Sequence, residues 1–326
     1  MEFTSILNRF SGLRMLVIGD IMLDHYIWGD VTRISPEAPV PIVNVLRDTY
    51  SAGGAANVAF NLANLGVETS LLGYYADDEA GKRVEAILKT NGVKVYSQKH
   101  AGKNPTIIKT RVVVKSQQLC RIDRESSHHE YAIENSDKFF IYLHELLAGK
   151  DAVIISDYAK GVVTQSLVNH IIDYSRDHPE LLVAIDPKPS RKLKYQNPAI
   201  LTPNRTEALQ LAGYSGTSAD DPRSLEDICQ KIHQLYSPIL LVITLGSDGM
   251  AICEKGEIIK ILPTVAREVF DVSGAGDTVI ATITAALSAG ANSIDAAKLA
   301  NFAAGTVVAH MGTVPVDIDE LKLSLK

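Results

Sequence analysis

Six short apolar segments, each ending in glycine, aspartate or proline, constrain the fold of this chain more than any other feature. They are MLVIGD (15–20), TSLLGYYADD (69–78), DAVIISDYAKG (151–161), LLVAIDPK (181–188), AILTPN (199–204) and ILLVITLGSDG (239–249). Such runs are typical of strands that are buried on both faces of a parallel sheet. Helical patterns separate them, at 56–66, 79–92, 166–178 and 224–236. This alternation predicts a doubly wound α/β fold with a mostly parallel sheet, in which ligands bind beyond the carboxyl ends of the strands.

Two segments rich in β-forming residues interrupt this alternation. Residues 28–50 combine prolines with β-formers, and residues 105–125 alternate in the manner of a hairpin. We interpret both as a small β-sheet that projects from the body as a lid over the site; edge strands of the main sheet are the alternative. Because exposed hairpin edges tend to be paired or covered, we expect a homodimer through the lid. Without an internal repeat or linker, residues 1–326 are expected to form a single domain.

Charge and composition exclude several classes of protein. The formal net charge of −6 argues against a nucleic-acid partner, which would favour a basic surface. The N-terminus lacks a secretory pattern and no apolar stretch is long enough to span a membrane, so we expect a cytoplasmic protein without a membrane partner. Cys120, Cys229 and Cys253 show neither metal-type nor disulfide-type spacing and are expected to be small buried apolar residues.

The segment EVFDVSGAGDTVIATITAALSAG (268–290) carries the strongest chemical signal. Glycines at the start of an apolar helix allow close backbone approach, and the free N–H groups there bind an anion. The carboxylate of Asp277 beside such a site suits a kinase, in which N–H groups stabilise the transferring phosphoryl group and the carboxylate takes the acceptor proton. A capping aspartate after a glycine turn is the structural alternative for GAGD alone.

A second segment, SAGGAANVAFNLANLG (51–66), supplies candidate contacts to a polyhydroxyl ligand. Gly53 and Gly54 permit backbone contact, and the amide of Asn57 offers both a donor and an acceptor. The alternative is a glycine pair required by helix packing. The chain has neither a GxGxxG fingerprint here nor a GxxxxGK[ST] P-loop, which disfavours a dinucleotide oxidoreductase and a P-loop kinase.

These two segments, in this order, resemble the two signatures of the PfkB carbohydrate kinase family, which has the ribokinase-like fold. The resemblance spans essentially the whole chain and implies that the enzyme uses ATP and Mg²⁺. It implies that Asp277 is the catalytic base and that Gly274, Ala275 and Gly276 form the anion hole. On the sugar side the family pattern implies roles for Asp24 in LVIGDIMLD and for the glycines and asparagine of 51–66, namely Gly53, Gly54 and Asn57.

On the ATP side the family pattern falls on three further segments. The residues it implies are Asn204 and Glu207 of NRTE, Thr244, Gly246 and Gly249 of TLGSDGM, and Asn301 of ANFAAG. The family's Asn-x-x-Glu organises Mg²⁺ and phosphate through water, so Glu207 would bind the metal through water. Plainer structural roles stay open: Asp24 as a turn cap, Asn204 with Glu207 as an ordinary helix cap, and Asn301 as a packing residue.

Narrower features, RISPEAPVP, TIIKTRVVVKSQQLCRID and ISDYAKG, are similar to the D-glycero-β-D-manno-heptose-7-phosphate kinases, which act in ADP-heptose synthesis for the lipopolysaccharide core. This resemblance implies phosphorylation of the anomeric hydroxyl to give the 1,7-bisphosphate. Many relatives carry a C-terminal nucleotidylyltransferase domain. Because no HxGH-type motif follows GTVPVDIDEL, we expect that second activity to be absent from this polypeptide.

A phosphorylated acceptor requires cations near its phosphate, because guanidinium and ammonium groups suit phosphate oxygens. The candidates are Arg33, Lys109, Arg111, Arg121 and Lys160, of which we assign Arg111 and Lys160 to substrate binding. Each of them by itself is also compatible with an ordinary surface charge. Two other functions stay open: a kinase for another sugar, sugar phosphate or nucleoside, and a regulator that binds nucleotide or sugar without catalysis.

Overall fold

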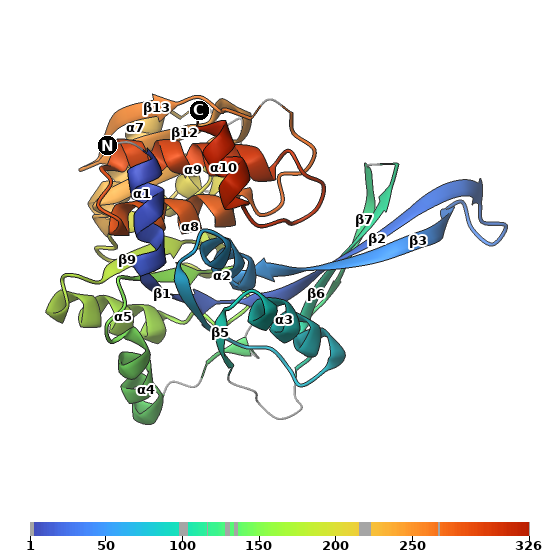
Figure 1. The fold of residues 1–326 in the computed structure, drawn as a ribbon, viewed down its shortest axis with the longest axis horizontal. Helices are drawn as coiled ribbons and strands as arrows, with labels where there is room; N and C mark the ends of the chain where they lie inside the picture. The colour runs from blue at the N-terminus through green and yellow to red at the C-terminus, as the bar shows by residue number, and fades with distance from the viewer. Residues whose placement is uncertain are drawn as a thin grey trace.

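The computed structural model describes residues 3–97, 104–115, 117–127, 131–133, 136–214, 223–266 and 268–325, which form two separate sheets (Figure 1). The larger sheet has the strand order β13-β12-β11-β10-β9-β8-β1-β4-β5. Its strands are β1 (Arg14–Gly19), β4 (Glu68–Gly73), β5 (Lys94–Ser97), β8 (Ala152–Ser156), β9 (Leu182–Asp186), β10 (Ile200–Leu201), β11 (Leu240–Thr244), β12 (Met250–Glu254) and β13 (Glu257–Leu262). Each of the six apolar segments overlaps one of these strands, and the predicted doubly wound α/β fold is confirmed.

All pairs from β5 to β11 are parallel, whereas β12 and β13 add an antiparallel hairpin at one edge. The hairpin follows from its turn, because Lys255 and Gly256 both have positive φ, at 51° and 82°. Two consecutive residues with positive φ form the tight turn that suits the twist of an antiparallel pair.

Helices cover both faces of this sheet. They are α1 (Phe3–Arg9), α2 (Ala55–Asn64), α3 (Glu79–Thr90), α4 (Asp137–Leu147), α5 (Gln165–Asp177), α6 (Arg205–Leu211), α7 (Leu225–Tyr236), α8 (Ala275–Ser288), α9 (Ser293–Val307) and α10 (Ile318–Ser324). Alternate residues of β1 enter two different cores: Met15 and Val17 pack with α2, α8 and α9, whereas Leu16 and Ile18 pack with α4, α5 and α7. Burial on both faces explains the unbroken apolar runs.

The smaller sheet projects from the body and is the predicted lid (Figure 1). Its order is β3-β2-β6-β7, with β2 (Ile21–Ile34), β3 (Pro41–Gly54), β6 (Ile107–Val114) and β7 (Gln117–Arg124). The two hairpins join through a parallel β2–β6 pair, so the alternative of edge strands in the main sheet is wrong. The first hairpin is longer than the expected 28–50, because β2 begins almost directly after β1 and β3 continues to the start of α2. Ser116, within the expected 105–125, lies outside the described residues.

The cysteines differ from expectation in two respects. Cys229 of α7 and Cys253 of β12 are buried as expected, but they lie side by side and are paired as a disulfide. Their spacing along the chain gave no sign of this, because helix and strand packing brings them together. Cys120 on β7 is exposed rather than buried. In the described part of the chain, none of the helices combines the length and the apolar character that a membrane crossing requires.

Candidate active site

The glycine-rich turn predicted to bind an anion lies at the start of α8. Gly274 is the N-terminal cap with φ of 84°, a conformation that favours glycine. A β-carbon there would lie 2.7 Å from Nδ2 of Asn57, so the glycine also makes room for that side chain. The N–H of Ala275 donates to the carbonyl of Val272, whereas the N–H groups of Gly276 and Asp277 have no backbone partner among the described residues. These two groups are therefore the available anion donors of this turn.

The carboxylate of Asp277 is buried in the first turn of α8, with a donor on each oxygen. Nδ2 of Asn57 donates to Oδ2 at 2.8 Å, and the hydroxyl of Tyr158 donates to Oδ1 at 2.7 Å. Burial raises the pKa of Asp277 to about 6; the two donors and Lys109 act in the lowering direction, and the charge of Asp24 acts in the raising direction. A pKa close to neutrality is what a general base requires.

Asn61, which sequence analysis missed, fixes the orientation of Asn57. Its Nδ2 donates to the carbonyl oxygen of Asn57 at 2.9 Å and to Oδ1 of Asn57 at 3.3 Å. Its own Oδ1 accepts from the hydroxyl of Thr278 and from the N–H of Val316. Each amide therefore has only one orientation that satisfies its partners, and Nδ2 of Asn57 must face Asp277. The one-turn spacing of the two asparagines on a predicted helix was the available signal.

On the sugar side, Asp24 of β2 is buried and already has partners. Its Oδ1 forms an ion pair with Arg111 of β6, and its Oδ2 accepts from the hydroxyl of Thr313 at 3.0 Å. A β-carbon on Gly53 would lie 2.7 Å from the same Oδ2, so this glycine leaves space for the carboxylate. Gly54, with φ of 59°, caps α2. The structure thus brings together two residues that were predicted separately, Asp24 and Arg111.

The five candidate cations are not equivalent. Three are paired with carboxylates: Arg111 with Asp24, Arg121 with Asp123, and Lys160 with Glu125 at 2.7 Å. Arg33 is exposed near the distal end of β2.

Lys109 is the candidate cation whose charge acts on Asp277. Its Nζ lies 5.3 Å from the ring centre of Tyr158, and it has no ion pair within the described part of the chain. Burial lowers the pKa of Lys109, while the charge of Asp24 acts against that shift. A half-buried cation without a carboxylate partner is better placed to bind a phosphate than one that is already neutralised.

On the nucleotide side, Asn204 and Glu207 form a reciprocal helix cap at the start of α6. Oδ1 of Asn204 accepts from the N–H of Glu207 at 2.9 Å, and Oε2 of Glu207 accepts from the N–H of Asn204 at 3.0 Å. Oε1 of Glu207 pairs with Lys188 at 2.7 Å. The capping arrangement that sequence analysis weighed against a phosphate role is therefore present, and the nucleotide role of both residues stays a prediction.

The remaining predicted nucleotide residues lie at the end of β11 and on α9. Thr244 bridges to Asn204, and Gly246 and Gly249 have positive φ, at 61° and 92°. A β-carbon on Gly249 would lie 2.0 Å from the carbonyl oxygen of residue 262, which excludes larger residues. Asn301 is buried and donates to the carbonyl of Pro263 at 2.7 Å, which is the packing role left open for it.

Asp186 and Glu207 are the carboxylates that would hold a divalent cation in the part of the site predicted to bind ATP. Burial raises the pKa of Asp186 at the end of β9 well above its usual range, and the neighbouring charges of Glu207 and Asp277 add to that effect. Carboxylate oxygens are hard donors of the kind that Mg²⁺ prefers. A bound cation would also offset the repulsion between neighbouring carboxylates. The described residues contain no group of three or more histidine, cysteine, aspartate or glutamate residues that would enclose a metal. The donor set therefore suits a cation that retains water and substrate phosphate as ligands.

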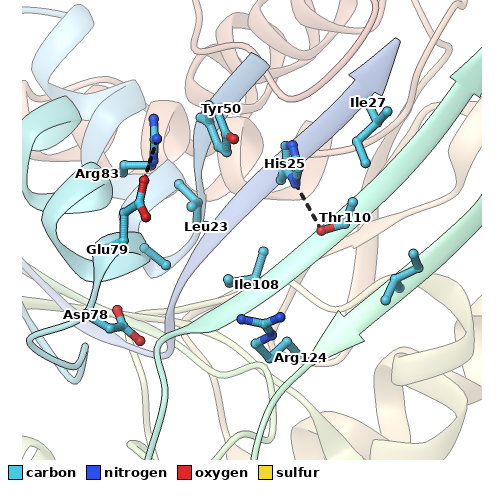
Figure 2. A pocket seen from close by; sticks show the side chains of 12 residues that line it. Leu23, His25, Ile27, Tyr50, Asp78, Glu79, Arg83, Ile108, Thr110 and Arg124 are labelled. Carbon is cyan, nitrogen blue, oxygen red and sulfur yellow. Dashed lines mark hydrogen bonds and ion pairs between the residues drawn. The ribbon is translucent and has the colours of Figure 1, made fainter. Parts of the chain in front are cut away.

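One cavity lies on the other face of the lid (Figure 2). It has a volume of about 460 Å³, and β2 lines it with Leu23, His25 and Ile27, which alternate with the site residue Asp24. Because successive residues of a strand point to opposite faces, this cavity is separate from the carboxylate of Asp277.

Comparison with known proteins agrees with this geometry. The sequence profile of the pfkB family carbohydrate kinases matches residues 13–319. The chain belongs to this family. The expectation of an ATP-dependent carbohydrate kinase is thereby confirmed, as is the resemblance on which it was based. A family match over nearly the whole chain also agrees with the order of the two glycine-rich segments, from 51–66 to 268–290.

Relatives of this pfkB family member include bifunctional proteins HldE. Identity is 41% to that of Magnetococcus marinus, over 98% of this chain and 65% of the relative, and 38% to that of Helicobacter pylori (strain ATCC 700392 / 26695), over 96% and 66%. The chain thus spans about 65% of the length of such relatives. Solved structures share the fold: a ribokinase of Arabidopsis thaliana complexed with ribose and ATP (TM-score 0.72, 23% identity, 96% and 99% coverage) and phosphofructokinase-2 of Escherichia coli (0.75, 18%, 96% and 98%). They confirm the ribokinase-like fold.

Proposed function

We propose that this chain transfers the γ-phosphoryl group of ATP to the anomeric hydroxyl of D-glycero-β-D-manno-heptose 7-phosphate, in ADP-heptose and lipopolysaccharide core synthesis in the cytoplasm. The observation that carries the proposal is the buried carboxylate of Asp277. It lies beside the N-terminus of α8, with Asp24 and Lys109 of the lid close enough to affect its pKa. The acceptor assignment is supported by the similarity of RISPEAPVP and ISDYAKG to heptose-7-phosphate kinases.

Asp277 accepts the proton of the acceptor hydroxyl as that oxygen attacks the γ-phosphorus. Because Asn57 and Tyr158 each occupy one lone pair of the carboxylate, one lone pair on each oxygen remains for the substrate. Asp24 binds hydroxyl groups of the sugar near Asp277, and Arg111 balances the charge of Asp24. General-base assistance of this kind contributes about 10²–10⁴-fold in rate.

The start of α8 stabilises the charge of the transferring group. The N–H groups of Gly276 and Asp277 and the positive end of the helix dipole act on the phosphoryl oxygens. We place Mg²⁺ beside Asp186 and Glu207, where it would neutralise charge on the ATP phosphates when bound. The turn at Thr244, Gly246 and Gly249 and the Asn301 region would bind the nucleotide, as the family pattern implies.

We assign binding of the acceptor's own phosphate first to Lys109. Arg111 and Lys160 are the second choices. Lys109 needs no carboxylate to be displaced, whereas phosphate binding by Arg111 or Lys160 would compete with Asp24 or Glu125. A cation is also required because a chain of net charge −6 would otherwise repel an anionic acceptor.

A direct test compares kcat/KM for heptose 7-phosphate and for heptose without the phosphate, in a coupled assay of ADP release. We expect a large preference for the phosphorylated acceptor, with both a higher kcat and a lower KM, because binding of the remote phosphate helps to hold the anomeric hydroxyl near Asp277. Equal values for the two sugars would reject the acceptor assignment and favour a free-sugar kinase.

We further propose that two copies associate through their lids and that residues 1–326 act as one domain. The outward face of the lid supports association through the lids, because it exposes large apolar side chains around the cavity of Figure 2. Ile122 and Tyr50 line that cavity and are 57% and 37% exposed. Leu23 and Ile108 form its apolar floor. Exposed apolar side chains rimmed by charged residues are typical of a surface that binds a protein partner, and we assign that partner to a second copy of this chain.

A further inference from the structure

The carboxylate of Asp20 clamps the loop that follows β8. Asp20 comes directly after β1 and is fully buried. Its Oδ2 accepts from the N–H groups of Tyr158 and Lys160 at 2.9 and 3.0 Å, and its Oδ1 accepts from the N–H of Val162 at 3.0 Å. Because β1 and β8 are hydrogen-bonded neighbours, the clamp connects the ends of two adjacent strands. Three hydrogen bonds from one loop to a single carboxylate leave that loop little freedom.

The loop is held in a conformation that it would otherwise avoid. Ala159, between two of the clamped N–H groups, has φ of 58°, a region that residues with a side chain disfavour. Its own N–H donates to Oδ1 of Asp157 at 2.7 Å. Such backbone strain persists where the surroundings enforce it, and it is frequent at functional sites.

The clamped loop directs Tyr158 at the base of the proposed reaction. Its hydroxyl lies 2.7 Å from Oδ1 of Asp277. Burial, with the charge of Asp277 next, raises the pKa of Tyr158 well above its usual range, so that its hydroxyl stays protonated. Tyr158 is therefore a permanent donor to this carboxylate, on the side opposite Asn57.

We propose that Tyr158, aimed by the loop that Asp20 clamps, is a positioning residue that fixes the orientation of the Asp277 carboxylate and stabilises its negative charge. The proposal rests on the proposed role of Asp277 as the base. With Asn57 on one oxygen and Tyr158 on the other, the carboxylate cannot rotate without losing a hydrogen bond, so the free lone pairs keep one direction toward the acceptor.

Charged groups on three other elements also act on Asp277. Asp24 of β2 and Lys109 of β6 act from the lid, and Asp186 acts from the end of β9. These groups are present whether or not residue 158 carries a hydroxyl. A comparison of the enzyme with a variant that lacks only this hydroxyl therefore isolates its effect.

The test is the pH profile of kcat/KM for Tyr158→Phe. We expect the acid limb to move upward by about one pH unit, because a lost donor to a carboxylate favours the protonated form. At pH values below the acid limbs of both enzymes, kcat/KM of the variant should then be about tenfold lower than that of the wild type. This difference should shrink as the pH rises above both limbs. KM for ATP should stay close to the wild-type value. Tyr195→Phe is the matched control. Tyr195 also donates from its hydroxyl to a carboxylate of the clamped loop, namely to Oδ2 of Asp157 at 3.0 Å.

Each outcome decides the proposal. An acid limb of Tyr158→Phe at the wild-type position would overturn it, and so would an equal displacement in Tyr195→Phe, which would indicate only a general effect on the loop. Asp20→Asn provides a second variant: it retains one acceptor oxygen for three N–H groups, and we expect an upward displacement of the same limb in folded protein, checked by circular dichroism. Full activity of Asp277→Asn would instead reject the base itself, so the two failures are distinguishable.

Discussion

The main sheet is covered on both faces, whereas the lid sheet is covered only in part. All five residues of β8 are buried, and all eight residues of β7 are exposed. The body holds Asp277 by Asn57 and Tyr158, each supported by a further buried polar residue. In the lid, by contrast, Arg111 pairs with the very carboxylate that is expected to bind the sugar.

This difference indicates that the body supplies fixed geometry, while the lid supplies charges whose pairing a substrate can change. It also predicts that substitutions in the body should act on kcat. Substitutions on the inner face of the lid should act on acceptor selectivity, and those on its outer face should act on association. The following predictions, from the largest expected effect to the smallest, test that division.

Asp277→Asn should give the largest effect, a loss of about 10²–10⁴-fold in kcat, because the amide cannot take the acceptor proton. ATP affinity and the circular dichroism spectrum should stay near those of the wild type, since the side chain keeps its volume. Steady-state kinetics and calorimetric ATP titration measure both. More than about a third of wild-type kcat in the variant would contradict the role of this carboxylate.

Lys109→Gln should lower kcat/KM for heptose 7-phosphate by about 10- to 100-fold, because a charge-assisted contact to phosphate is lost. The value for unphosphorylated heptose should change little. Both should be measured at pH 8, where Asp277 is ionised even if loss of the lysine raises its pKa. Arg124→Gln is the matched control, since Arg124 lies on the same sheet but lines the outer cavity. Equal losses for the two sugars would assign Lys109 to another task.

The pH profile of the wild type should have an acid limb near the pKa of Asp277, which burial raises to about 6. The base is the ionised form, so kcat/KM should be constant above this pH and fall about tenfold for each unit below it. A limb near the ordinary pKa of an aspartate would show that the base is not buried in the working enzyme, and would weaken the contrast between body and lid.

Ile122→Asp should weaken association without changing kcat, because it places a charge on the outer face of the lid, where Ile122 is 57% exposed. Leu323→Asp on α10, at 66% exposure, is the control for a charge on an unrelated apolar position. Analytical ultracentrifugation should show the wild type and the control as dimers and the lid variant shifted toward monomer. A monomeric wild type at working concentration would remove the proposed role of this face.

The sequence by itself determined the layers of the fold and the first choice of base. Unbroken apolar runs give strands that are covered on both faces, and glycines before Asp277 give an open helix N-terminus, because both are local consequences of side-chain size and hydrophobicity. The existence of the lid also followed from local pattern. Its exact strands did not, since strand ends depend on the parallel contact between β2 and β6.

Only the tertiary structure decided which polar residues meet. Asn57 of α2, Tyr158 of the loop after β8 and Asp277 of α8 lie far apart in the chain, and the packing of α2 and of that loop against α8 brings them together. In the lid, the pairing of β2 with β6 brings Arg111 to Asp24 and leaves Lys109 without an ion pair among the described residues. Charge pairing and desolvation depend on distances in space, which residue types and their spacing do not contain.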